Sequence, residues 1–186
     1  MKMNKLTVSY FRKKKKDNEK ITALSVYDYT TAKFADETGI ELLLIGDSLG
    51  MTIQGHNNTI PVTLEQSLYH SRIVTRATKR AFVIGDMPFL TYQISPEQAM
   101  ENAARYLQES LVNGVKLEGG VKMAPTIARL VETGIPVLGH IGLLPQNVLT
   151  AGGYIIRGKT EEDINSLIED AKAVEDAGAF AMVVEG

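Results

Sequence analysis

Short apolar runs recur along the chain, and each ends on a glycine or a small polar residue. Leu42 to Ile45 is the clearest of them, because it leads directly into Gly46 and Asp47. An apolar run of this length with a polar end predicts a buried strand whose end lies at a surface. The pattern predicts six strands, at residues 21–27, 42–45, 81–87, 115–118, 136–140 and 179–185.

Segments with helix-start signals separate these strands. Ser95 is a predicted N-cap, with Pro96 at the first helical position and Gln98 three residues after the cap. Thr160 is the predicted cap of a later helix. Helices are expected at residues 5–17, 30–37, 64–78, 95–112, 122–132 and 160–177, and glycine-rich loops without regular structure at 49–63 and 141–159.

Strands that alternate with helices indicate βαβ units and a parallel sheet, so the fold class is α/β. Two architectures remain open, a doubly wound sheet and a (β/α)8 TIM-type barrel. No Gly-x-Gly-x-x-Gly motif opens the first of these helices, which weakens the case for a dinucleotide-binding sheet. Polar residues at the ends of at least five strands favour the barrel, whose site collects residues from many strand ends. Because a barrel needs eight strands, residues 1–186 are expected to form one barrel domain of about six β/α units, incomplete at the C-terminus.

Composition excludes several classes of function. The net charge of -2 gives no field that would attract nucleic acid or an anionic membrane, and the basic run Arg12 to Lys16 is interpreted as a solvated helix end. The chain has no cysteine, which removes disulfides and thiolate chemistry and fits a reducing compartment. No apolar run approaches the roughly 20 residues of a membrane span. We therefore expect a cytoplasmic protein without nucleic-acid or membrane partners.

Three carboxylates end three successive predicted strands: Asp47, Asp86 and Glu118. In a barrel these ends converge, and three carboxylates that close together repel one another unless a cation neutralises them. Oxygen ligands without histidine or cysteine select Mg²⁺ or a similar ion over zinc. Each acid could instead cap the helix that follows it, but metal binding explains all three together.

Three further residues belong to the same strand ends. Lys116 precedes Glu118 by two positions, so both side chains point to one side of their strand. A buried lysine needs an anionic partner, which is either Glu118 or a substrate carboxylate. His140 ends the fifth strand as a structural donor or as a site residue. Glu185 follows an apolar run, which suits proton abstraction, although a solvated loop acid is the alternative.

Six segments carry a resemblance to a known family: VYDYTTAKFAD, LLLIGDSLGMTIQGHNNTIPVT, IGDMPF, VKLEGG, GHIGLLPQ and GGYIIRGK. In this order and spacing they closely resemble the ketopantoate hydroxymethyltransferase family, from about residue 5 to the end. The resemblance implies a (β/α)8 barrel of the phosphoenolpyruvate/pyruvate type. It also implies transfer of a hydroxymethyl group from 5,10-methylenetetrahydrofolate to 3-methyl-2-oxobutanoate, giving 2-dehydropantoate for pantothenate synthesis.

The resemblance further implies the roles of individual residues. Asp47 and Asp86 resemble ligands of Mg²⁺ that also contact the substrate, and Glu118 completes the metal site directly or through water. A divalent ion chelated by the keto and carboxylate oxygens of a 2-oxo acid would stabilise the enolate formed by loss of the C3 proton.

The remaining implied roles concern substrate binding and the base. Ser48, Lys116 and His140 resemble substrate contacts, and Glu185 resembles the base that removes the C3 proton. The partners implied are a small 2-oxo acid, folate and further copies of the chain in a homo-oligomer.

Two other hypotheses stay open. One is a metal-dependent carbon–carbon lyase or mutase that acts on a 2-oxo acid without folate. The other is an inactive fragment that needs another chain, because the family pattern continues through strands seven and eight. On this second hypothesis, a polypeptide of residues 1–186 alone has bare sheet edges, aggregates or partly unfolds, and has little or no activity.

Overall fold

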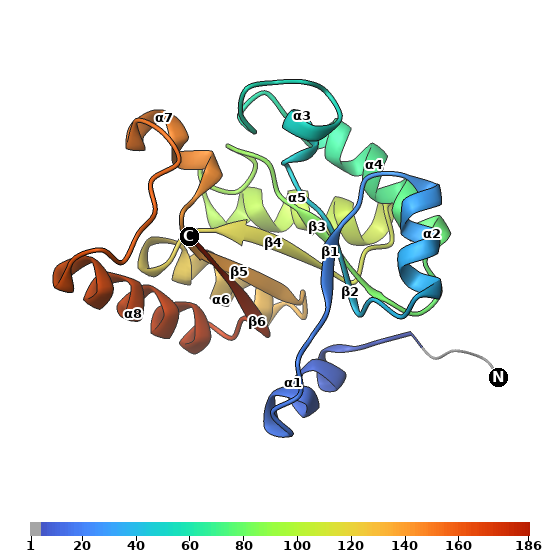
Figure 1. Cartoon of the computed structure of the whole chain (residues 1–186), viewed down its shortest axis with the longest axis horizontal. Coiled ribbons are helices and arrows are strands. Elements are labelled where there is room, and N and C mark those ends of the chain that lie inside the picture. Colours follow the sequence, from blue (N-terminus) through green and yellow to red (C-terminus); the bar gives the residue numbers. More distant parts are fainter. Residues whose placement is uncertain (1–4) are drawn as a thin grey trace.

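The computed structural model describes residues 5–186 and shows six parallel strands in one curled sheet, part of an α/β barrel (Figure 1). Each strand pairs in parallel with the next along the chain, in the order β1-β2-β3-β4-β5-β6. The prediction of a barrel-type α/β fold with six strands is confirmed. The strands are β1 (Ala23–Ser25), β2 (Leu42–Ile45), β3 (Phe82–Asp86), β4 (Gly114–Glu118), β5 (Val137–Gly142) and β6 (Ala181–Glu185).

Helices connect the strands, and α4, α5, α6 and α8 pack on the outer face of the sheet (Figure 1). Ser95 and Thr160 cap their helices through side-chain hydrogen bonds from the backbone N–H groups of Gln98 and Asp163, as predicted. The longer helices are α1 (Val8–Lys16), α2 (Tyr29–Glu37), α4 (Leu64–Ala77), α5 (Pro96–Glu109), α6 (Ala124–Glu132) and α8 (Glu161–Asp176).

The two predicted loops contain short helices, so the prediction that they lack regular structure is wrong. The first loop holds α3 (Leu49–Thr52), and the second holds α7 (Val148–Ala151) after a 3-10 turn. Gly50 lies inside α3, where its lack of a side chain allows another part of the loop to pack closely against the helix. A Cβ at Gly50 would lie 2.6 Å from Val62 Cγ2, so the absence of a side chain lets the loop fold back over the helix. The first strand is also shorter than predicted.

Helix α1 closes the N-terminal end of the sheet from inside the curl. Phe11 is 2% exposed and packs edge-to-face against Phe82, with ring centroids 5.3 Å apart. Leu6 and Phe11 are buried in this inner cluster, and Tyr10 packs against it. The basic run that follows Phe11 forms the last turns of α1, where its side chains are mostly exposed. The helix therefore acts as an apolar plug below the site.

Glu41 fixes this plug to the sheet. Its carboxylate accepts hydrogen bonds from Tyr10 Oη at 2.5 Å and from the Thr22 N–H at 2.8 Å, and it pairs with Lys14. Burial alone would raise the pKa of Glu41, but the hydrogen bonds from Lys14, Tyr10 and Thr22 lower it to about 2. The ionised carboxylate is thus strongly favoured in the folded state.

We expect Glu41→Gln to lower the free energy of unfolding at neutral pH by about 2 kcal/mol, less than the full pKa shift implies because Lys14 lies near solvent. A depressed pKa gives stability that is present above the unfolded value of 4.5 and is lost as pH falls towards about 2.

Denaturant unfolding of the full-length protein between pH 7 and pH 3 checks this expectation. The wild type should lose the larger part of the difference over that range. Glu19→Gln, which changes an exposed acid near Lys14, should behave like the wild type. An identical pH slope in Glu41→Gln and the wild type would contradict the assignment.

The outer edges of β1 and β6 pair with no strand among residues 5–186. An apolar groove of about 310 Å³ lies between them, lined by residues such as Leu24, Leu44, Leu138 and Val183. The expectation that a polypeptide of residues 1–186 alone aggregates or lacks activity stays a prediction. Within the described part of the chain, no helix has the length and apolar character needed to cross a membrane.

Candidate active site

The inner face of the sheet changes from apolar to polar towards the ends of several strands. On β3, Phe82 and Ile84 belong to the apolar cluster that packs against α1, and Asp86 comes next on the same face. On β5, Leu138 is likewise followed by His140. Because the strands are parallel, their charged ends meet at one edge of the sheet. The fold thus separates an apolar floor from a polar site above it.

A cavity of about 490 Å³ lies at this edge, and all seven predicted site residues line it. The structure therefore brings together every residue singled out from the sequence, although it leaves their roles as predictions. The seven residues are Asp47, Ser48, Asp86, Lys116, Glu118, His140 and Glu185.

Lys116 lies between two of the carboxylates. Its Nζ donates to both carboxylate oxygens of Asp86 at 2.8 Å and lies 3.5 Å from Glu118 Oε1. Asp86 stands opposite Lys116 in the pairing of β3 with β4, which explains the contact. Burial would lower the pKa of Lys116, but Asp86, Glu118 and Asp47 raise it above its ordinary value, so the amine stays charged. The anionic partner predicted for Lys116 is thus chiefly Asp86, which neither sequence alternative named.

Asp47 is 3% exposed and lies beside Asp86. Its backbone N–H donates to Asp86 Oδ2 at 3.0 Å, and its Oδ2 accepts from Gln146 Nε2 at 2.9 Å. Burial, followed by repulsion from Asp86, raises the pKa of Asp47 to about 8. This carboxylate is therefore destabilised when ionised, as expected for an acid whose charge no protein cation balances.

The donor set fits a divalent cation by its chemistry. Three buried carboxylates, Asp47, Asp86 and Glu118, face one amine, so negative charge is in excess. All three offer the hard oxygen ligands that Mg²⁺ prefers. As the side chains stand, no three acids or histidines within residues 5–186 converge closely enough to hold an ion, because Lys116 and Gln146 lie between them. The metal site stays a prediction.

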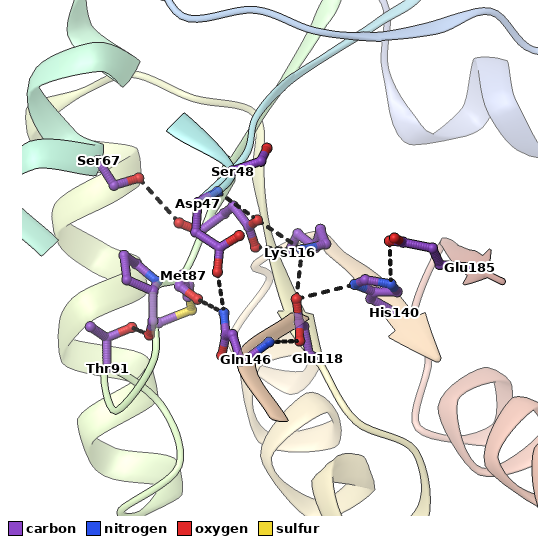
Figure 2. Close-up of polar contacts among 12 residues, drawn as sticks. Asp47, Ser48, Ser67, Met87, Thr91, Lys116, Glu118, His140, Gln146 and Glu185 are labelled. Atoms are coloured by element: carbon purple, nitrogen blue, oxygen red, sulfur yellow. Dashed lines mark hydrogen bonds and ion pairs between the residues drawn. The ribbon is translucent and has the colours of Figure 1, made fainter. Parts of the chain in front are cut away.

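His140 joins the carboxylates to the rim of the cavity. Its Nδ1 lies 3.3 Å from Glu118 Oε1, and its Nε2 lies 3.2 Å from Glu185 Oε2 (Figure 2). Neither contact is aligned as a hydrogen bond, so both ring nitrogens of this buried histidine lack a well-placed partner. The Glu185 side chain is 48% exposed, which agrees with the alternative of a solvated acid, because β6 pairs only with β5 among residues 5–186.

Sequence reasoning missed several residues around the cavity. Tyr27 is one of them: its Oη lies 2.7 Å from Oγ of the predicted residue Ser48 and fixes that serine in the turn after β2. Thr59 is 1% exposed, lines the cavity and has no hydrogen-bond partner for its hydroxyl among the described residues. Gln146 is 3% exposed and contacts two of the carboxylates. The only sign of these residues in the sequence was that they lie in the segments that resemble the family. Thr59 and Gln146 lie in predicted loops, where no periodicity shows which way a side chain points.

Solved structures share this fold. Phosphonopyruvate hydrolase in complex with oxalate and Mg²⁺ matches with a TM-score of 0.70 at 12% identity, over 97% of this chain and 64% of that chain. Phosphoenolpyruvate phosphomutase from Streptomyces platensis subsp. rosaceus matches with a TM-score of 0.70 at 15% identity, over 96% and 64%. 2,3-dimethylmalate lyase, a PEP mutase/isocitrate lyase superfamily member, matches with a TM-score of 0.67 at 20% identity, over 98% and 64%. This chain thus shares the α/β-barrel fold of these structures.

A narrower match identifies the family. The family model of ketopantoate hydroxymethyltransferase matches residues 5–186, and the chain belongs to this family. Two relatives named 3-methyl-2-oxobutanoate hydroxymethyltransferase are similar to it. The one from Carboxydothermus hydrogenoformans is 49% identical over 98% of this chain and 66% of its own length. The one from Dehalococcoides mccartyi is 50% identical over 96% and 64%. The chain therefore spans slightly less than two thirds of these relatives.

Proposed function

We propose that the protein transfers a hydroxymethyl group from 5,10-methylenetetrahydrofolate to 3-methyl-2-oxobutanoate, giving 2-dehydropantoate for pantothenate biosynthesis. The observation that carries the proposal is the buried cluster of Asp47, Asp86, Glu118 and Lys116 in a chain of this family. Two relatives at about half identity carry the name of this activity. The proposal includes action in the cytoplasm and assembly into a homo-oligomer.

Asp47 and Asp86 would hold Mg²⁺, and Glu118 would complete the site directly or through water. Their excess of negative charge over Lys116 supports this assignment. When bound, the cation supplies electrostatic stabilisation of the negative charge that develops on the 2-oxo acid. Ser48, Lys116 and His140 would contact the substrate, with the charged amine and the hydroxyl directed at its carboxylate end.

Glu185 is the proposed base. Its carboxylate takes the C3 proton, and the electrons of the C3–H bond form the C2=C3 double bond of the enolate. Water cleaves the two C–N bonds of the folate methylene bridge, which releases tetrahydrofolate and formaldehyde. C3 then adds to the carbonyl carbon of the formaldehyde, and the carbonyl oxygen takes up a proton to become the hydroxyl of the new hydroxymethyl group. The half-exposed position of Glu185 lets the proton pass to solvent, and His140 lies 3.2 Å away to orient the carboxylate.

The proposal is tested by incubating the purified full-length protein with 3-methyl-2-oxobutanoate, Mg²⁺ and methylenetetrahydrofolate. We expect 2-dehydropantoate to form by mass spectrometry, with no product when either folate or Mg²⁺ is omitted. Carbon–carbon cleavage of a 2-oxo acid at an equal rate without folate would favour the lyase hypothesis and contradict the transferase.

A further inference from the structure

Gln146 occupies the space between the ends of three strands. It lies in the 3-10 turn Pro145–Asn147 after β5, yet its contacts reach Asp47 beyond β2, Met87 beyond β3 and Glu118 at the end of β4 (Figure 2). The residue is 3% exposed, so these contacts are shielded from water. A buried amide with this many partners is fixed in place, because each lost hydrogen bond would leave an unsatisfied polar group.

The orientation of the amide follows from its neighbours. Met87 offers a backbone carbonyl 3.0 Å away, which can only accept, so Nε2 must face it and therefore also Asp47 Oδ2 at 2.9 Å. On the other side, Tyr92 Oη lies 2.7 Å from Oε1. Because Tyr92 Oη already accepts the Glu118 N–H at 3.0 Å, its own proton is free to be donated to Gln146. Both ends of the amide thus agree on one orientation.

The same turn also holds Glu118. The backbone N–H of Gln146 donates to Glu118 Oε2 at 3.1 Å, while the Glu118 N–H reaches Gln146 through Tyr92. These contacts close a ring from the backbone of Glu118 to its own carboxylate. Gln93 Nε2 adds a second donor to Gln146 Oε1 at 2.9 Å. One residue therefore contacts two carboxylates from different parts of the sheet, Asp47 through its side-chain amide and Glu118 through its backbone N–H.

We propose that Gln146 is a positioning residue, which holds the carboxylates of Asp47 and Glu118 apart and oriented to receive a divalent cation. This inference rests on the proposed function, in which both acids belong to the metal site. A neutral amide suits this task, because it donates to Asp47 without cancelling the negative charge that attracts the cation. Lys116 holds the carboxylate of Asp86 in a similar way, but with a charged donor.

The test measures Mn²⁺ affinity of the full-length protein, by electron paramagnetic resonance of free Mn²⁺ without substrate. Gln146→Met keeps the length of the side chain and removes both of its polar ends, and we expect Kd to rise at least about tenfold. Tyr92→Phe removes the donor that fixes the amide and leaves Asp47 in contact with Gln146, so a smaller rise is expected. Gln108→Met, the same change at an exposed position of α5, serves as control. A second readout is turnover at saturating Mn²⁺, where kcat should recover in part.

The outcomes separate this inference from the proposed function. Weaker Mn²⁺ binding in both variants, with far-ultraviolet circular dichroism like that of the wild type, supports a positioning role. Wild-type affinity in Gln146→Met, or in Tyr92→Phe if the first variant does not fold, would overturn the role of Gln146 alone. A wild-type protein that binds no Mn²⁺ would overturn the metal site and this inference with it.

Discussion

Asp47→Ala is expected to abolish the dependence on a divalent cation and to lower turnover at least about a hundredfold. The change removes one of the proposed ligands together with stabilisation of the developing enolate. It should not lower the free energy of unfolding, because burial and Asp86 raise the pKa of Asp47 to about 8 and its charge is unfavourable in the folded protein. Loss of function without loss of stability is the signature of a residue kept for chemistry.

Asp47 gives a cleaner test than Asp86. Removing Asp86 would leave buried Lys116 without its main partner, which typically costs about 3–5 kcal/mol of stability. Isothermal calorimetry with Mg²⁺ measures the effect directly, and Asp176→Ala on the exposed side of α8 serves as control. Wild-type Mg²⁺ affinity in Asp47→Ala would contradict the assignment of Asp47 as a metal ligand. Glu118→Ala should be milder if this acid acts through water.

Glu185→Gln is expected to bind 3-methyl-2-oxobutanoate normally and to lose exchange of the C3 proton with deuterated water, by at least about a hundredfold. The amide keeps the shape of the side chain but is a far weaker base than a carboxylate. Because the Glu185 side chain is 48% exposed, the substitution should leave the fold intact. Glu175→Gln, at an exposed position of α8, is the matched control. Exchange at the wild-type rate in Glu185→Gln would assign the base to another residue.

Much of the fold followed from local patterns in the sequence. The buried strands β3, β4 and β5 are short, mostly apolar segments that end in glycine or a polar residue, and their observed bounds lie close to the predicted ones. The N-caps Ser95 and Thr160 were visible because capping uses neighbouring residues only. The short helix α3 was missed because glycine was interpreted as a helix breaker, whereas Gly50 serves the close approach of Val62.

The candidate site was predictable to the extent that topology determines it. Parallel strands place their ends together, so the gathering of Asp47, Asp86 and Glu118 required no knowledge of tertiary contacts. The ion-pair partner of Lys116 could not be predicted in this way, because its pairing with Asp86 depends on the register between β3 and β4. Gln146 was invisible as a site residue for a similar reason: its role arises from contacts with residues 28 and 99 positions away along the chain.

Exchange of the C3 proton by the full-length wild-type protein tests the central claim most directly, since it isolates the step assigned to the carboxylate cluster and Glu185. Proton nuclear magnetic resonance follows 3-methyl-2-oxobutanoate in deuterated water without folate. We predict enzyme-dependent loss of the C3 signal with Mg²⁺, none after chelation with EDTA, and recovery when Mg²⁺ is restored. Exchange that is equally fast in EDTA, or no exchange with Mg²⁺ although the 2-oxo acid binds, would contradict the account.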